Sequence, residues 1–191
     1  TLDYNITTLD YNISTLDYDI IREAIMNSGA RSYFQVILII LAYSFTIMIL
    51  DQASKFYIIH IIDLPNKLSI VAVPGFFNLK MAWNEGINFG LFASGNISRR
   101  IALILISTLI CLGIFLWAVT KKSHFLHLYA SAIIGGAIGN LLDRILYGAV
   151  ADFLNFTCCG IQNPYSFNIA DISIFLGALG IIFFPSSSNK S

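Results

Sequence analysis

Four long apolar segments constrain the fold of this chain more than any other feature. A helix needs roughly 20 apolar residues to cross a bilayer, with a lower limit of about 17. Only 12% of the 191 residues are charged and 57% are hydrophobic, whereas soluble domains carry roughly 25% charged residues. The sequence therefore predicts a mainly α-helical integral membrane protein with four transmembrane helices, at residues 34–50, 101–120, 125 to about 144, and about 169–184.

The stretch between the first two apolar segments, residues 56–98, is too polar to span a membrane and is interrupted by proline and glycine. Within it, residues 68–73 and 76–81 are rich in β-branched and aromatic side chains, which favour strands. We expect a small β element on the membrane surface. Residues 147–165 are predicted to form a second loop, of mixed character, on the same side.

The first 31 residues differ from the rest of the chain. A seven-residue unit, Thr-Leu-Asp-Tyr-Asn-Ile-Thr at residues 1–7, recurs with drift through residue 21. Its leucines and isoleucines follow a heptad spacing, but Thr, Asn, Asp and Tyr are weak helix formers. We expect residues 1–31 to be a disordered or interfacial extension, and residues 32–191 to be the four-helix membrane domain.

Four aspartates lie in or beside the apolar segments, and two of them have a basic residue at hand. Asp51 and Lys55 are four residues apart with the acid first, a spacing that allows an ion pair on one helix face. Asp143 adjoins Arg144, although neighbouring residues on a helix point apart. Asp51 is therefore predicted to be a structural anchor rather than a catalytic acid.

The other two aspartates, Asp152 and Asp171, have no basic residue close by in the sequence. An unpaired carboxylate beside a membrane is costly and marks a functional candidate. Two such acids, if they converge, suggest an aspartic acid/base pair that shares one proton. The alternative at this point is that each acid caps a helix or accepts a hydrogen bond from a backbone amide.

Asn168 and Asp171 form an N-cap pattern at the start of the last apolar segment, with the acid three residues into the helix. The helix dipole favours an anion at this end. We therefore expect Asp171 to be the ionised member of the pair and Asp152 the protonated one.

Two polar residues end rows of small residues in the third apolar segment. Asn140 follows Ala132 and Gly136 at a spacing of four, and Asp143 follows Gly135 and Gly139 in the same way. Small residues allow helices to approach closely. The side chains of Asn140 and Asp143 are therefore expected to face the interior of the bundle near one membrane surface.

No cofactor or metal site is predicted. The three histidines lack metal-ligand spacing. Cys111, Cys158 and Cys159 form neither a CxxC motif nor an even set, and they are expected to pack as small apolar side chains. The net charge of zero gives no indication of a nucleic-acid partner.

Taken together, these motifs resemble the lipoprotein signal peptidases (signal peptidase II) of bacteria. Four blocks occur in the order found in that family, over about residues 32–185. They are Asp51-Gln52-Ala53-Ser54-Lys55; Phe77-Asn78-Leu79 with Asn84-Glu85-Gly86-Ile87-Asn88-Phe89-Gly90; Gly139-Asn140-Leu141-Leu142-Asp143-Arg144 with Gly148 and Val150-Ala151-Asp152-Phe153; and Phe167-Asn168-Ile169-Ala170-Asp171. The chain departs from the family at two positions, because a small residue is usual at Asn88 and valine is common at Ala151.

The resemblance implies a multi-pass protein of the bacterial inner (plasma) membrane, with its active site and β element on the extracytoplasmic side. Residues 32–191 would be an aspartic endopeptidase domain without a cofactor. It would remove the signal peptide from diacylglyceryl-modified prolipoproteins, cleaving before the lipid-modified cysteine with a water activated by two aspartates. A monomer in contact with membrane lipid, inhibited by globomycin-type compounds and without a nucleic-acid partner, is expected.

The resemblance also implies roles for particular residues. Asp152 and Asp171 match the catalytic pair of the family. The positions that match supporting or substrate-binding residues are Asp51, Lys55, Asn84, Gly86, Asn140, Asp143, Arg144 and Asn168.

Two other functions compete with this interpretation. A proton-coupled transporter could use Asp143, Asp152 and Asp171 as a relay, but the acids cluster at one end of the spans and no inverted repeat is visible. Intramembrane aspartic proteases of the prepilin or presenilin type carry a Gly-x-Gly-Asp block, which this sequence lacks.

Overall fold

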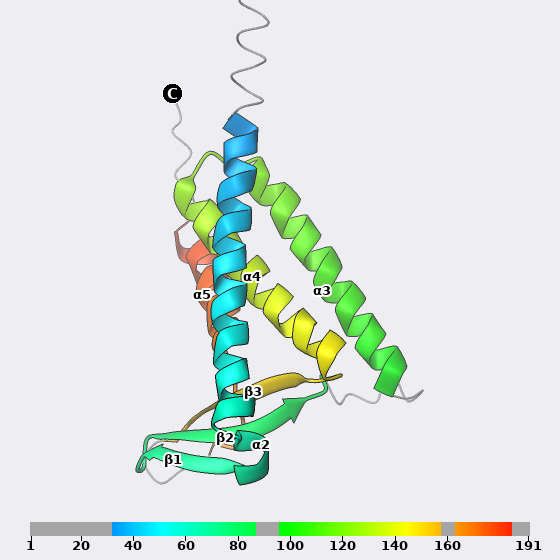
Figure 1. The fold of residues 1–191 in the computed structure, drawn as a ribbon. Helices are drawn as coiled ribbons and strands as arrows, with labels where there is room; N and C mark the ends of the chain where they lie inside the picture. The colour runs from blue at the N-terminus through cyan, green and yellow to red at the C-terminus, as the bar shows by residue number, and fades with distance from the viewer. Residues whose placement is uncertain (1–31, 87–95, 158–162, 185–191) are drawn as a thin grey trace, which may run out of the picture. The chain divides into compact units, whose positions relative to one another are not determined.

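The computed structural model describes residues 32–86, 96–157 and 163–184. The repeat at residues 1–31, together with Asn88, Cys158 and Cys159, lies outside the described residues. Helices make up most of what is described (Figure 1). They are a first helix, Ser32–Ile61, followed by α2 (Leu64–Lys67), α3 (Asn96–Val119), α4 (His124–Leu146) and α5 (Ile169–Phe183).

Three of the described helices are long and apolar enough to cross a membrane, namely Ser32–Ile61, Ile97–Val119 and His124–Leu146. They confirm the prediction of a mainly helical membrane protein. The fourth predicted span corresponds to α5, which is apolar but only 15 residues long. The described helices thus confirm three of the four predicted spans.

The first helix is longer than the sequence predicted. We expected its apolar segment to end at residue 50, and residues 56–98 to lie outside the membrane. The helix instead continues past Asp51 and Lys55 and ends with a π-helical turn at Tyr57–Ile61. Both charged side chains are buried, so their polarity does not end the helix.

A three-stranded antiparallel sheet lies at one end of the helices (Figure 1). Its order is β1 (Ser69–Val73), β2 (Phe77–Asn84) and β3 (Val150–Phe156). The β1–β2 hairpin confirms the predicted β element. Pro74 and Gly75 form its turn, because the φ angle of Gly75 is +76° and the Phe76 N–H donates to the Val73 carbonyl at 3.1 Å.

Strand β3 corrects the prediction for residues 147–165, which we expected to form a loop. Ala82 of β2 lies opposite Asp152, and Leu154 also bridges to Phe167 on its other side. Residues 150–153 are all buried, and a strand buried on both faces loses the alternation of polar and apolar residues by which strands are recognised.

A small hydrophobic core joins the sheet to the helices. Ile58 from the last turn of the first helix, Leu64 from α2 and Phe153 from β3 are buried together. The strands β1 and β2 contribute Ile70 and Leu79 to the same core. This core fixes the base of β3, the strand that carries Asp152.

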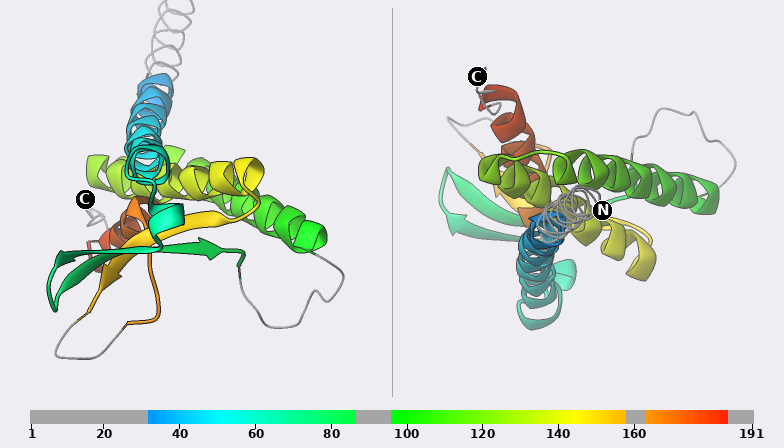
Figure 2. Two further views of the ribbon diagram at one scale, coloured as in Figure 1. Left: turned by 60° about the horizontal axis from the view of Figure 1, so that its bottom comes forward. Right: turned by 90° about the horizontal axis from the view of Figure 1, so that it is seen from above.

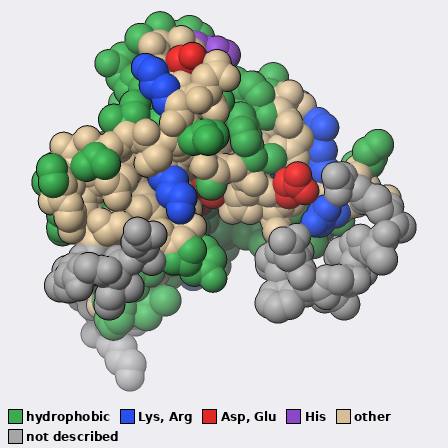
Figure 3. All heavy atoms as spheres, turned by 90° about the horizontal axis from the view of Figure 1, so that it is seen from below, with side chains coloured by type: hydrophobic (Ala, Val, Ile, Leu, Met, Phe, Trp, Pro, Cys, Tyr) green, Lys and Arg blue, Asp and Glu red, His purple; other side chains and the backbone are tan. Residues whose placement is uncertain are grey.

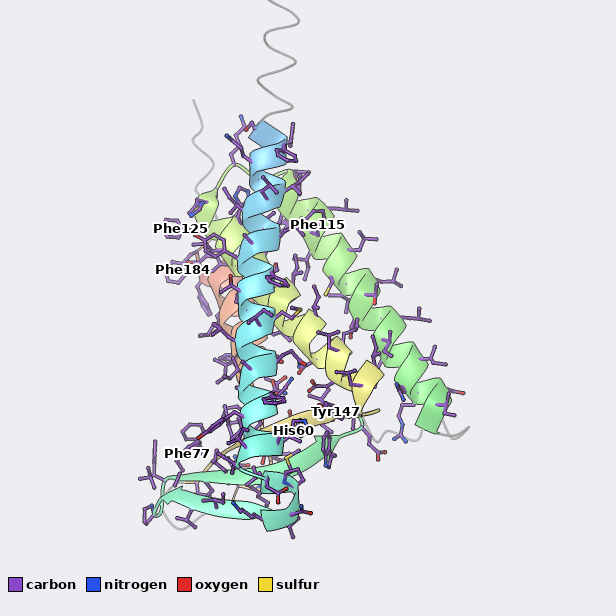
Figure 4. All side chains as sticks on the ribbon, viewed as in Figure 1. His60, Phe77, Phe115, Phe125, Tyr147 and Phe184 are labelled. Atoms are coloured by element: carbon purple, nitrogen blue, oxygen red, sulfur yellow. The ribbon has the colours of Figure 1, made fainter. Side chains whose placement is uncertain are left out.

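Helix α4 packs against both α3 and α5 (Figure 2). The predicted close approach is confirmed at Gly136, where an added Cβ would lie 2.5 Å from the Ala170 carbonyl oxygen. The two ends of the bundle are marked by aromatic side chains in Figure 4, where Tyr147 and His60 lie at the sheet end and Phe115 and Phe184 at the opposite end. The close packing of α4 and α5 brings the start of α5 beside the polar end of α4.

Candidate functional site

Asp152 and Asp171 come from two different elements that meet at the sheet end of the helices. Asp152 lies on β3, and Asp171 lies in the first turn of α5. The predicted N-cap is confirmed as a capping box. Asn168 Oδ1 accepts a hydrogen bond from the Asp171 N–H at 2.9 Å, and Asp171 Oδ2 accepts one from the Asn168 N–H at 3.2 Å.

Amide groups bind all four carboxylate oxygens of these two acids. Asp152 Oδ1 accepts from Asn168 Nδ2 at 2.6 Å, and Asp152 Oδ2 accepts from Asn84 Nδ2 at 3.1 Å. Asp171 Oδ1 accepts from Asn140 Nδ2 at 2.9 Å, while its Oδ2 takes the capping bond. Neither acid forms an ion pair with a described residue, so both are held by neutral donors.

The two acids influence each other electrostatically. Asp152 is only 3% exposed. Burial, and after it the negative charge of Asp171, raise the pKa of Asp152 to about 6, while hydrogen bonds from Asn84 and Asn168 and the positive charge of Lys55 oppose the shift. A carboxyl group with such a pKa keeps a proton far more readily near neutral pH than an ordinary aspartate. The prediction that Asp152 carries the proton and Asp171 is ionised requires the pKa of Asp152 to be raised in this way.

Asp51, Lys55 and Asp143 form a second group, which we call the ion-paired cluster. Their side chains are 0%, 2% and 0% exposed. Lys55 Nζ lies 2.7 Å from Asp51 Oδ2 and 2.8 Å from Asp143 Oδ2. The predicted pairing of Asp51 with Lys55 is therefore confirmed, and Asp143 joins it from α4. One cation facing two carboxylates leaves the cluster with a net charge of −1.

The ion-paired cluster is bonded to the backbone beside both acids of the pair. Asp51 Oδ1 accepts a hydrogen bond from the Ala170 N–H at 2.9 Å. Asp143 Oδ2 accepts one from the Ala151 N–H at 3.1 Å. Ala170 and Ala151 immediately precede Asp171 and Asp152, so one cluster reaches both segments.

Gln52 also belongs to this cluster, although no role was predicted for it from the sequence. Its Nε2 donates to Asp143 Oδ1 at 2.9 Å and to the Gly139 carbonyl at 3.1 Å. Helix neighbours usually point apart, so its position directly after Asp51 gave no reason to group the two. Gly139 also has a steric role, because a Cβ added there would lie 2.5 Å from Asp51 Oδ2.

Arg144, another predicted site residue, lies close to the acids. Arg144 interacts electrostatically with Asp152, Asp143 and Asp171. Its Nη1 donates to the Asn140 carbonyl at 3.3 Å. Its Nε is buried and has no hydrogen-bond partner in the described part of the chain, so it retains a donor.

Gly86 orients the amide of Asn84. The Gly86 N–H donates to Asn84 Oδ1 at 2.9 Å, which leaves Asn84 Nδ2 for Asp152. The φ angle of Gly86 is +99°, a conformation that favours glycine. The structure thus places all ten predicted site residues in two connected polar groups. Ala151, one of the two departures from the family, is fully buried and contributes through its backbone.

The surroundings of the site suit a membrane boundary. Figure 3 views the molecule from the sheet side and shows hydrophobic side chains spread among few charged ones. Leu68, Val71, Val73 and Phe76 of the β element are all exposed. Among the described residues, no group of three or more His, Cys, Asp or Glu side chains is placed to hold a metal ion.

Known proteins of one family are similar to this chain. The family model described as signal peptidase (SPase) II matches residues 43–185. A lipoprotein signal peptidase of Rhodopseudomonas palustris (strain TIE-1) is 35% identical over 137 residues, which cover 70% of this chain and 83% of that protein. A lipoprotein signal peptidase of Maridesulfovibrio salexigens is 38% identical over 138 residues, covering 71% of this chain and 86% of that protein.

Two solved structures described as bacterial membrane enzymes share the fold. One has a TM-score of 0.63 and 26% identity, covering 80% of this chain and 91% of its own. The other has a TM-score of 0.65 and 27% identity, covering 78% and 93%. With its membrane-spanning helices and the matched residues 43–185, the chain is a membrane protein that belongs to the signal peptidase II family.

Proposed function

We propose that this chain is an aspartic endopeptidase that removes the signal peptide from diacylglyceryl-modified prolipoproteins, cleaving before the lipid-modified cysteine. The substrate class follows from the relatives, which are named lipoprotein signal peptidases. The observation that carries the catalytic assignment is the meeting of Asp152 and Asp171 from separate elements. Amides hold their oxygens and no described cation pairs with them.

The chemistry uses one proton shared between two acids. Ionised Asp171 takes a proton from a water, and the oxygen of that water attacks the scissile carbonyl carbon. Protonated Asp152 gives its proton to the carbonyl oxygen. As the tetrahedral intermediate breaks down, Asp171 returns a proton to the leaving nitrogen and Asp152 recovers one from a hydroxyl of the intermediate. Both acids end in the protonation states in which they began.

The raised pKa of Asp152 supports this division of roles. Its value of about 6 lies close to the pH at which a general acid works efficiently. Asp171, at the N-terminal end of α5, lies where the helix dipole favours a negative charge. The unpaired Nε of Arg144 is a donor that could bind a carbonyl of the substrate peptide.

The same proposal covers the membrane arrangement. We place α5 as a short fourth span, with the sheet and both acids on the extracytoplasmic side of the bacterial inner membrane. The acyl chains of the substrate then remain in lipid while the cleavage site reaches the acids. The enzyme is expected to act as a monomer and to be inhibited by globomycin-type compounds, which would compete for the same site.

The test is processing of a lipid-modified prolipoprotein by membranes that contain Asp152→Asn or Asp171→Asn. Either change should lower the cleavage rate by about 10³-fold, within the range for loss of general acid–base catalysis. Asp63→Asn is the matched control, because the Asp63 carboxylate is exposed and bonds only to Asn66 among the described side chains. Cleavage retained in either dyad variant would contradict the proposal, and normal processing with lost ion flux would favour the transporter.

A further inference from the structure

We propose that Lys55 is a positioning residue for the two acids, which it holds at a fixed separation through the ion-paired cluster and Asn140. This inference rests on the proposed function and assigns a role to a side chain that touches neither acid. Its basis is a set of buried contacts that start at the Lys55 ammonium group and end at Asp152 and Asp171.

The first route from Lys55 to the acids runs through the backbone. Each carboxylate of the cluster is bonded to Lys55 and also to a backbone N–H next to one acid, Asp51 to Ala170 and Asp143 to Ala151. The two acids lie on separate elements, β3 and α5, which follow one another in the chain. Lys55 is thus a common partner of both segments, in addition to the direct bonds that Phe167 and Asn168 make to β3.

The second route runs through the amide of Asn140. Asn140 Oδ1 accepts from Lys55 Nζ at 3.1 Å, and its Nδ2 donates to Asp171 Oδ1 at 2.9 Å. A flipped amide would place its NH₂ group against an ammonium that can only donate, and its oxygen against a carboxylate that only accepts when ionised. The charge of Lys55 therefore selects the amide orientation that Asp171 requires.

Asn168 extends this route to the other acid. Its Nδ2 donates to Asn140 Oδ1 at 3.1 Å and to Asp152 Oδ1 at 2.6 Å. Asn140 and Asn168 are 8% and 0% exposed, so water does not substitute for these bonds easily. A displacement of Lys55 would shift Asp171 through the amide of Asn140. It would shift Asp152 through the amides of Asn140 and Asn168.

Charge neutralisation alone is the competing role for Lys55, and a charge-matched variant separates the two. Lys55→Met combined with Asp51→Asn removes one positive and one negative charge, so the cluster keeps its net charge of −1. Arg144, the cation on α4 that interacts electrostatically with both acids, is unchanged in this variant, as is Asp143. A fall in kcat that remains in this variant comes from the lost ion pairs and hydrogen bonds of Lys55 and Asp51.

The experiment uses the purified full chain in lipid, with lipid-modified prolipoprotein as the substrate. We expect the double variant to lose about 100-fold in kcat, the size of effect that a misplacement of about 1 Å can cause. KM should stay within about threefold, because the lost contacts do not bind substrate. Lys80→Met is the matched control, because Lys80 is exposed on β2.

A second measurement does not depend on activity. Infrared titration of the protonated carboxyl signal, assigned by its loss in Asp152→Asn, follows the proton of Asp152 directly. Loss of the Lys55 charge by itself would raise the midpoint, because that charge lowers the pKa of Asp152. A midpoint that moves down in the double variant, as we expect, therefore reports acids that have drifted apart and repel each other less. Lys55→Arg, which keeps the charge but changes the position of the donors, should lower kcat by at least about tenfold.

The outcomes are distinct. A double variant with wild-type kcat and a midpoint that does not move down, or a Lys55→Arg variant with wild-type kcat, would reduce Lys55 to a counter-charge and overturn the proposal. A raised KM with unchanged kcat would overturn it by making Lys55 a binding residue. If the wild-type chain does not cleave the prolipoprotein, the proposed function fails alone, and the infrared midpoint still decides whether Lys55 positions the pair.

Discussion

Two groups of aspartates lie side by side at the sheet end of the described helices, and only one of them forms ion pairs with a described cation. Asp51 and Asp143 share the ammonium group of Lys55, whereas Asp152 and Asp171 are held by amides. Asp51, Asp143 and Asp152 are all nearly inaccessible to solvent. Burial alone therefore does not distinguish the two groups, and the charge of the partner does.

The difference assigns opposite energetic roles to the two groups. An ion-paired carboxylate stabilises the fold as long as its partner is present, and loss of one partner leaves an uncompensated buried charge. An amide-held carboxylate beside a second acid is costly to ionise and keeps its proton. The cluster should accordingly control stability, and the pair should control chemistry.

The largest expected effect is on stability, in Lys55→Met. Asp51 and Asp143 then lose their common cation, so the free energy of unfolding should fall by about 3–5 kcal/mol, as for other broken buried pairs. Denaturant unfolding in detergent micelles measures this, with Asp152→Asn as the comparison at about 1 kcal/mol or less, since it removes no ion pair. A smaller loss in Lys55→Met than in Asp152→Asn would reverse the roles of the two groups.

The next effect is a pH dependence that belongs to the pair. The folded-state pKa of Asp152 is about 6 against 3.8 for an unperturbed aspartate, so between these values the folded state binds more protons than the unfolded state. By linkage, this contribution to stability is fully present below the unfolded pKa and is lost as the pH rises through about 6. Two units at 1.36 kcal/mol each give a change of about 3 kcal/mol.

The measurement for this effect is the difference in unfolding free energy between the wild type and Asp152→Asn, followed from about pH 4 to about pH 7. The wild type should lose stability relative to the variant as the pH rises. A difference that stays flat over this window would mean that Asp152 is as easily ionised as an exposed aspartate.

A third effect concerns the fit around the ion-paired cluster. Gly139→Ala places a Cβ 2.5 Å from Asp51 Oδ2, and such overpacking typically costs about 1–3 kcal/mol. Gly113→Ala is the matched control on α3, where an added Cβ meets nothing within 4 Å, and it should be neutral or slightly stabilising. Equal unfolding midpoints for the two variants would show that the cluster is loosely packed.

The sequence predicted the contacts that depend on local spacing. The ion pair of Asp51 with Lys55 and the capping box of Asn168 with Asp171 follow from positions four and three residues apart, and both are confirmed. The strands β1 and β2 followed from their β-branched and aromatic side chains. These features need no knowledge of where other elements lie.

The contacts that depend on tertiary packing were not predictable in the same way. Lys55 and Asp143 are far apart in the sequence, and only the packing of the first helix against α4 brings them to 2.8 Å. Strand β3 was missed because its first residues are buried on both faces, which removes the alternating pattern. Gln52 was missed because its partners, Asp143 and Gly139, lie on another helix.

The smallest expected effect, and the most specific to the pair, is in Asn84→Ala. The hydrogen bond from Asn84 Nδ2 lowers the pKa of Asp152, so its loss should raise the apparent pKa of the pair. A mechanism that needs one protonated acid loses activity as that proton leaves, so the basic limb of kcat/KM should move to higher pH. Because Asn84 is exposed, we expect a shift of less than about one unit.

The control for this shift is Asn66→Ala, because Asn66 bonds to the exposed Asp63 and not to the pair. A limb that moves to lower pH in Asn84→Ala would show that Asn84 stabilises the protonated form of Asp152 instead, and would exchange the roles proposed for the two acids. An unchanged limb would show that water takes over the bond made by the amide. The pair would then depend only on Asn140 and Asn168, the two amides that are bonded to each other beside Lys55.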